Sequence, residues 1–555
     1  MRFQRVLQIL LFSLFFYLFW LAAYPLPGWV EVDLFLRLDP LISLGTMAVA
    51  RAFIPKVALA LVILGVALFL GRIFCGYLCP LGATIDFADW LQGKKPKGEN
   101  SFEERGSHRY LKYWLLVALG GSALVGISWI FLFSPLSLAT RFYSFVVYPL
   151  ALLLLNFFLD VFRPVFPLIG LDHLAFVHFS VPQYNTNLFT GLFVLGVLAL
   201  GALRSRFWCR NLCPAGAMIA LFSMRPLFRR TVSERCTACG KCVRACPMGA
   251  ISKDFKSTSH SECVTCLRCR EVCPEQAVSF RVTRRVPVLR EEVNLGRRRV
   301  LGAGAAGMAA AALTMSNLHH LHGRESPRAL RSSRLLRPPG ALPEPDFQAR
   351  CVRCGKCIKA CLTNTLQPVW FEAGLSGLWT PKVTARLAGC EQGCAVCGQV
   401  CPTGAVRPLP LEEKIFAKIG TARIEKSRCI AWEQDKKCLI CDEICPYNAI
   451  VSRFVEGLTV TVPVMDENRC NGCGYCEDKC PVIGESAIIV EPLGEVRLAA
   501  GSYREKAREL GLVFHAKNGV EDHFILDGAR EESHRGDDQD VSRDTDFRPQ
   551  RTPQQ

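Results

Sequence analysis

The stretch CTACGKCVRACP at residues 236–247, followed by CVTCLRCREVCP at residues 263–274, decides the fold of the middle of this chain. In each stretch three cysteines recur at every third position, and a fourth follows four positions later, directly before a proline. This spacing lets one short loop present three sulfurs to a cubane [4Fe–4S] cluster, while the fourth sulfur reaches a neighbouring cluster. A bacterial-type ferredoxin of α+β fold is therefore predicted. Its two ligand sets would be Cys236, Cys239, Cys242 with Cys273, and Cys263, Cys266, Cys269 with Cys246.

Four further groups of four cysteines lie between residues 345 and 490, so that six clusters are predicted in all. A proline follows the last cysteine of every group except the first, where Leu362 stands. The eight residues between Cys429 and Cys438 form a loop insertion and do not remove a ligand. By nested symmetry, we expect the first and last groups to share two clusters and the two inner groups to share two more. The groups are Cys351, Cys354, Cys357, Cys361; Cys390, Cys394, Cys397, Cys401; Cys429, Cys438, Cys441, Cys445; and Cys470, Cys473, Cys476, Cys480.

The remaining four of the 28 cysteines form two CxxxCP motifs, Cys75 with Cys79 and Cys209 with Cys213. Their surroundings repeat, which indicates an internal duplication of a two-helix unit. Three interpretations stay open: buried packing, joint binding of another cluster or metal, and thiol redox chemistry or partner docking. The matching residues are Arg72, Cys75, Leu78, Cys79, Pro80, Gly82, Ala83, Ile85 and Arg206, Cys209, Leu212, Cys213, Pro214, Gly216, Ala217, Ile219.

Hydropathy predicts a membrane domain before the first ferredoxin. Half of the residues are apolar, and apolar runs at about 7–24, 57–70, 113–133 and 188–203 predict about four spans with both CxxxCP motifs on the inner face. The stretch 143–162 is expected to be an outer-face helix, flat or re-entrant, with two extra spans within 143–182 as the alternative. The fold class is thus multidomain: a helical membrane bundle with a two-fold internal repeat, followed by α+β ferredoxin domains.

The net charge of +17 does not indicate nucleic-acid binding. Much of it lies beside the apolar runs, as in Lys94, Lys95, Lys97 and Arg229, which follows the positive-inside rule of membrane proteins. No soluble part of the sequence combines a basic stripe with stacking aromatic residues. Repeated CxxC spacing also excludes a small disulfide scaffold as the main use of the cysteines.

Ionisable residues beside membrane segments are candidates for a quinol site. Asp86, Asp89, His173 and His178 occupy such positions. Each of them taken alone is also typical of a membrane interface.

A basic segment separates the two iron–sulfur regions. GRRRVL at residues 296–301 precedes a weakly apolar Ala/Gly run to Met315 and then His319, His320 and His322. The pattern resembles a twin-arginine export signal placed inside the chain, and a flexible linker is the alternative, because 16 residues at about 1.5 Å each fall short of a span. The GxGxxG spacing within it lacks the preceding strand that a dinucleotide site needs.

With these motifs in place, the chain resembles a natural fusion of two families. Residues 1–285 are similar to NapH-type membrane ferredoxins, which combine two CxxxCP motifs with a two-cluster domain. Residues 296–490 are similar to NapG/MauM-type ferredoxins, including the CIAWEQDKKCLICDEICP form of the third group. The resemblance implies that electrons pass from membrane quinol, a diffusible donor, to a periplasmic reductase or cytochrome, with the nitrate reductase as the type partner and twin-arginine machinery for export.

We therefore expect an electron carrier of the bacterial inner membrane without a substrate-converting site of its own. The expected parts are residues 1–228 in the bilayer, 229–285 in the cytoplasm, a linker at 286–344, 345–495 in the periplasm, and a disordered tail at 496–555. The alternative is an assembly or regulatory factor for a respiratory metalloenzyme. Electron transfer across the membrane meets one physical difficulty. Roughly 30 Å of hydrocarbon would separate the cytoplasmic clusters from the periplasmic clusters, which is too far for direct exchange unless another carrier lies between them.

Overall fold

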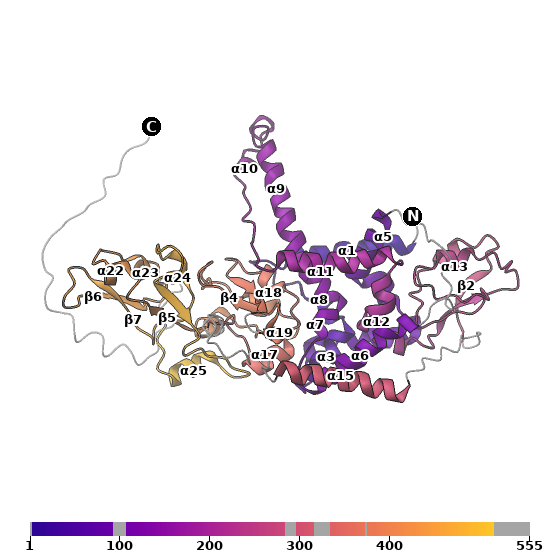
Figure 1. Ribbon diagram of the computed structural model, residues 1–555. Coiled ribbons are helices and arrows are strands. Elements are labelled where there is room, and N and C mark those ends of the chain that lie inside the picture. The colour runs from indigo at the N-terminus through magenta and orange to yellow at the C-terminus, as the bar shows by residue number, and fades with distance from the viewer. Residues whose placement is uncertain (1–2, 93–106, 284–295, 316–333, 372–373, 515–555) are drawn as a thin grey trace.

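The computed structural model describes residues 3–92, 107–283, 296–315, 334–371 and 374–514. Lys94, Lys95, Lys97, the three histidines at 319, 320 and 322, and the tail from residue 515 lie outside the described residues. The chain is multidomain and mostly helical. A central helical domain lies between the first ferredoxin, at one end, and the second iron–sulfur region, at the other (Figure 1).

The helical domain is built from apolar helices that pack around a common core. Within the described residues, Gln4–Leu21 and Pro135–Phe162 are long and apolar enough to cross a membrane by length and composition. The other apolar helices have 10–17 residues, fewer than the roughly 20 that a span needs. Its helices are α1 Phe3–Leu21, α2 Leu34–Arg37, α3 Pro40–Ala50, α4 Ala60–Leu70, α5 Pro80–Leu91, α6 Leu111–Leu124, α7 Ile130–Phe133, α8 Pro135–Phe142, α9 Tyr148–Phe162, α10 Asp172–Ala175, α11 Asn187–Ala199 and α12 Pro214–Phe222.

These lengths do not support the expected four-span bundle. The expectation for residues 143–162 also changes, because α8 and α9 form one continuous helix through a π-helical turn at Tyr143–Val147. No residue between Phe142 and Tyr148 breaks the helix. α9 stands out from the body of the domain (Figure 1), and its apolar side chains, such as Leu154 and Phe157, are more than half exposed.

The expected internal repeat appears in the local structure of the two CxxxCP motifs. Each begins with a π-helical turn, Phe74–Leu78 in one copy and Trp208–Leu212 in the other. The second cysteine is then extended, with φ/ψ of −71°/113° at Cys79 and −73°/108° at Cys213. A proline follows as the first residue of α5 or α12, where its missing N–H costs nothing.

The first ferredoxin closes on the antiparallel pair of β1 (Phe228–Val232) and β2 (Val278–Val282), which bracket both cysteine groups. Between them lie α13 (Lys241–Ala245) and α14 (Arg268–Glu271). The two strands bring the first and last residues of the unit together, so that the cysteine loops face each other across a small core.

The second region repeats this plan. β5 (Thr421–Ile424) pairs with β8 (Ile488–Glu491) around the last two cysteine groups, and β6 (Ile450–Arg453) pairs with β7 (Val462–Met465) between them. β3 (Leu366–Pro368) pairs with β4 (Pro381–Val383) between the first two groups. The helices are α17 Glu344–Arg350, α18 Lys356–Lys359, α19 Gly374–Gly377, α20 Val396–Gln399, α21 Leu411–Lys414, α22 Ile430–Glu433, α23 Ile440–Glu443, α24 Tyr475–Lys479 and α25 Tyr503–Glu509.

The expected tail boundary at residue 496 is wrong. α25 packs on α21, where Glu413 accepts hydrogen bonds from the backbone N–H of Tyr503 (2.6 Å) and from Ser502 (2.6 Å). Tyr503 and Phe514 are buried in the core of the region. Two buried aromatic residues supply enough apolar contact to order a segment whose charged composition suggested disorder.

The basic segment forms α15 (Arg297–Met315), which packs along α6 of the helical domain. The glycines of the GxGxxG pattern make this contact close: a Cβ at Gly307 would lie 2.0 Å from the carbonyl oxygen of Ala118, and one at Gly121 would lie 2.4 Å from that of Gly304. Small residues that let two helix backbones touch are typical of helix pairs in membranes.

We expect Gly307→Leu to destabilise the helical domain by about 1–3 kcal/mol, because the new side chain cannot fit against the backbone of α6. Gly302→Leu on the same helix is the matched control, since no atom lies within 4 Å of its Cβ position. Thermal unfolding in detergent should show a lower Tm for the first variant alone. Equal melting of both variants would contradict the α6–α15 contact.

Candidate iron–sulfur centres

The cysteines of the first ferredoxin line two cavities in the predicted combination. One cavity, of about 320 Å³, is lined by Cys236, Cys239, Cys242 and Cys273. The other, of about 360 Å³, is lined by Cys246, Cys263, Cys266 and Cys269. The structure thus brings together both predicted ligand sets, each with the fourth cysteine of the opposite group.

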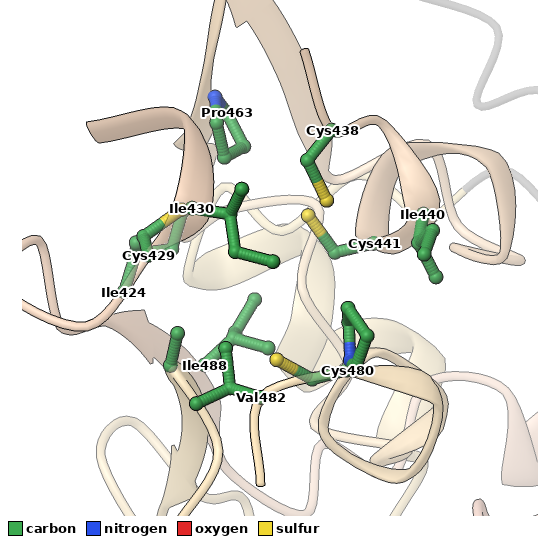
Figure 2. A pocket seen from close by; sticks show the side chains of 12 residues that line it. Ile424, Cys429, Ile430, Cys438, Ile440, Cys441, Pro463, Cys480, Val482 and Ile488 are labelled. Carbon is green, nitrogen blue, oxygen red and sulfur yellow. The ribbon is translucent and has the colours of Figure 1, made fainter. Parts of the chain in front are cut away.

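The last two cysteine groups form a second pair of cavities. One, of about 390 Å³, is lined by Cys429, Cys438, Cys441 and Cys480, and Figure 2 shows the sulfurs of Cys438, Cys441 and Cys480 turned toward the same space. The other, of about 310 Å³, is lined by Cys445, Cys470, Cys473 and Cys476.

The two groups before them also exchange their fourth cysteines. Cys357 interacts electrostatically with Cys354, Cys351 and Cys401. Cys397 interacts with Cys390, Cys394 and Cys361. Short helices α18 and α20, which carry these groups, pack against each other.

The nested pairing expected from sequence is therefore wrong, because the cysteines that lie together come from consecutive groups. The physical reason lies in the strands: β5 and β8 close one ferredoxin unit around the third and fourth groups, just as β1 and β2 do around the first ferredoxin. A strand pair that encloses two cysteine groups forces their loops together.

The donor sets fit [4Fe–4S] clusters. Each cavity presents four thiol sulfurs, the ligands that such clusters take. Within the described residues, no group of three or more His, Cys, Asp or Glu side chains is arranged to hold a single metal ion. Thiols spread around a cavity of several hundred cubic ångströms suit a four-iron cube better than one ion.

The four CxxxCP cysteines, from two distant segments, line a fifth cavity of about 350 Å³ inside the helical domain. Cys79, Cys209 and Cys213 are less than 10% exposed. Two buried arginines lie beside these cysteines, and each contacts the repeat to which it does not belong. Arg72 Nη2, from the first repeat, lies 2.7 Å from where a Cβ on Gly216 of the second repeat would be. Arg206 Nη2, from the second repeat, lies 3.9 Å from where a Cβ on Gly82 of the first repeat would be. Each arginine thus reaches the CxxxCP loop of the other repeat.

This cavity adjoins the first ferredoxin through the loop inside the first CxxxCP motif. A Cβ at Gly76 would lie 2.6 Å from the carbonyl oxygen of Val264, and the Tyr77 hydroxyl donates to the carbonyl oxygen of Thr265 at 2.9 Å. Val264 and Thr265 lie between Cys263 and Cys266, two of the predicted cluster ligands. The two cysteine-bearing loops are therefore in direct contact.

A buried charge cluster fixes the same interface. Glu262 pairs with Arg72 at 3.1 Å and with Lys112. Burial alone would raise the pKa of Glu262, but Lys112, Arg72 and Arg109 lower it to about 2. Glu262 is therefore an anion at neutral pH, and its charge offsets two buried cations. Sequence reasoning missed this residue because its partners lie far away in the chain.

The second iron–sulfur region binds the opposite end of the helical domain through cations. Lys359 donates to the carbonyl oxygen of Phe19 (2.7 Å), in the last turn of α1, and to that of Ala22 (3.0 Å), just past the end of this helix. Arg353 donates to Ser128 at 3.0 Å, with its guanidinium 3.6 Å from the centre of the Phe131 ring. All of these cations come from the first cysteine group of that region.

The quinol-site candidates do not form one site. Asp86 pairs with Arg206 at 2.7 Å, and Asp89 accepts from Ser205 at 2.8 Å. His173 and His178 are exposed beyond the end of α9. The two carboxylates thus hold Arg206 in position and lie apart from the two histidines.

Fold and cavities define a multidomain iron–sulfur protein with ferredoxin domains. Family models described as "4Fe-4S binding domain" match residues 231–252, 263–277 and 462–488, and a further one matches 55–98 and 186–233, which contain the CxxxCP motifs.

Curated relatives place the chain more narrowly. It is 36% identical over 171 residues to the methylamine utilization ferredoxin-type protein MauM of Methylophilus methylotrophus, covering 30% of this chain and 74% of the relative. It is 34% identical over 210 residues to the ferredoxin-type protein NapG of Escherichia coli, covering 36% of this chain and 86% of the relative. The ferredoxin-type protein NapF of the same organism is 33% identical over 165 residues, 29% of this chain and 88% of the relative. The chain belongs to this family of ferredoxin-type proteins.

Proposed function

We propose that the protein conducts electrons from the quinol pool of a bacterial inner membrane toward a periplasmic reductase or cytochrome. The observation that carries the proposal is the position of the helical domain, which contacts an iron–sulfur module at each of its ends. When bound, [4Fe–4S] clusters supply one-electron exchange without substrate chemistry. The cysteines of this chain would hold such clusters at both ends of the apolar helical domain.

A series of contacts supports a continuous route through the second region. Cys357 of one ligand set interacts with Cys397 of the next. The backbone N–H of Cys390 donates to the carbonyl oxygen of Cys473 at 2.7 Å, which joins that set to the third. Cys476 interacts with Cys441 of the last set. The ligand sets thus follow one another in a line, as a conductor needs.

The membrane location is supported by the exposed apolar surface of the helical domain. Leu153, Leu154, Phe157 and Phe158 on α9 are each more than half exposed, which costs free energy in water and none in lipid. We propose that residues 1–285 correspond to a NapH-type protein fused to a NapG/MauM-type protein. The short helices would then cross a thinned or locally distorted bilayer.

α15 supports placement of the two modules on opposite sides. It begins with three exposed arginines, Arg297, Arg298 and Arg299, and runs along the helical domain from the side of the first ferredoxin to the side of the second (Figure 1). We propose that this segment is read by the twin-arginine machinery and stays in the bundle as a crossing helix. The second region would then reach the periplasm.

Topology reporters fused after Thr283 and after Gly340 test this arrangement. We expect the reporter after Thr283 to indicate the cytoplasm and the reporter after Gly340 to indicate the periplasm, because α15 lies between the two fusion points. Addition of a reduced quinol to membrane vesicles should then produce the EPR signals of reduced clusters. Reporters on the same side, or clusters that stay oxidised, would contradict the conduit.

A further inference from the structure

We propose that Cys75, Cys79, Cys209 and Cys213 together bind a seventh [4Fe–4S] cluster inside the helical domain. Their cavity of about 350 Å³ lies within the range of 310–390 Å³ found for the four ferredoxin cavities. It likewise presents four cysteines from two facing loops. The space between these four cysteines is therefore of the same size as the space between each ferredoxin ligand set.

The backbone at these motifs matches that of a ferredoxin ligand. Cys246, a predicted cluster ligand followed by a proline, has φ/ψ of −75°/109°. Cys79 and Cys213 have −71°/113° and −73°/108°, and each also precedes a proline. The same Cys-Pro geometry therefore presents sulfur in the ferredoxin and in the helical domain.

Charge and hydrogen-bond donors around the cavity fit an anionic occupant. A cube with four thiolate ligands carries net negative charge, and Arg72 and Arg206, both 0–1% exposed, lie beside the cavity. Each arginine is also paired with a carboxylate, Arg72 with Glu262 and Arg206 with Asp86. Arg72 Nη2 is 3.9 Å from Cys75 Sγ. The buried indole Nε1 of Trp208, which lines the cavity, has no hydrogen-bond partner among the described residues. A buried donor without a partner is costly, and a cluster sulfide or thiolate would accept from it.

The position of the site answers the difficulty of distance through the bilayer. On one side, its loop touches the ligand loop of Cys263 and Cys266 through Gly76. On the other side, Pro135 lines the cavity, while Arg141 on the same helix interacts with Cys351 and Cys354 of the second region. Six residues of α8 span about 9 Å. A cluster here would stand between the two modules.

The inference deepens the proposed function but is tested separately. A bound cluster would take up one electron from one neighbour and release one to the other, with no covalent bond formed or broken. Its presence can be measured as iron and sulfide, which do not depend on the donor. If the protein holds iron for seven clusters but quinol does not reduce them, the seventh site is supported and the proposed function is refuted. If quinol reduces the clusters but the iron suffices for six only, the proposed function is supported and the seventh site is refuted.

The test is a double variant, Cys79→Ala with Cys213→Ala, made in the full chain and purified anaerobically in detergent. We expect about four iron and four sulfide fewer per chain than in the wild type, and one EPR signal lost while the six others stay. The matched control is Leu78→Ala with Leu212→Ala, neighbouring residues that do not line the cavity, and it should keep the full content.

Two results would overturn the proposal. In one, the wild type holds iron and sulfide for six clusters only, or zinc or copper in place of the seventh. In the other, the double variant keeps the iron and sulfide content of the wild type. If the double variant does not fold, the six remaining EPR signals disappear too, and the metal and sulfide content of the wild type alone then decides.

Discussion

Cys429→Ala and Cys480→Ala should abolish the same EPR signal, although the two cysteines belong to different cysteine groups. Both line the cavity shown in Figure 2, and a cube that loses one of four thiolates is no longer fully ligated. We expect each variant to lose about four iron atoms per chain. Redox titration followed by low-temperature EPR separates the signals.

Cys445→Ala is the matched control, because Cys445 belongs to the same group as Cys429 but lines the neighbouring cavity with Cys470, Cys473 and Cys476. It should abolish a different signal and leave the first one intact. Nested pairing would instead link Cys480 with the group of Cys351. A shared signal loss for Cys480→Ala and Cys351→Ala would therefore refute the observed pairing.

The sequence could predict which cysteines of the first ferredoxin lie around one cavity, because the spacing within a cysteine group is a local property. Three sulfurs in one loop, with a proline after the fourth, encode how a short segment surrounds a cube. The pairing in the first ferredoxin followed from the same rule, since its two cysteine groups have no others nearby. In the second region any two of the four cysteine groups could pair. The pairing of β5 with β8, which are far apart in the sequence, brings the third group together with the fourth.

The helical domain shows a second limit. The repeat around Arg72 and Arg206 was visible in the sequence, but the crossing of each arginine to the loop of the other repeat depends on how the two helix pairs pack. In the same way, the sequence around Gly304 and Gly307 predicted an export signal or a linker, and the close contact of these glycines with α6 depends on how two distant helices pack.

Glu262→Gln should destabilise the contact between the first ferredoxin and the helical domain by about 3–5 kcal/mol, because it leaves two buried cations without their anion. The pKa of Glu262 lies near 2 in the folded chain, below its ordinary value of 4.5. Its stabilisation is therefore complete above pH about 4.5 and is lost as the pH falls toward 2. At pH 7 the variant loses the full contribution, which thermal or denaturant unfolding in detergent would measure.

Glu234→Gln, at an exposed position of the same ferredoxin, is the matched control and should melt like the wild type. Adding Lys112→Met to Glu262→Gln removes one of the two stranded cations, since Lys112 and Arg72 share this carboxylate, and should recover part of the lost stability. Equal stability of Glu262→Gln and wild type, or no recovery in the double variant, would mean that the buried charges do not hold the ferredoxin against the CxxxCP loops. Arg72 also lines the cavity of the proposed seventh cluster. Glu262→Gln should therefore shift the reduction potential of that cluster if loss of the carboxylate lets Arg72 move.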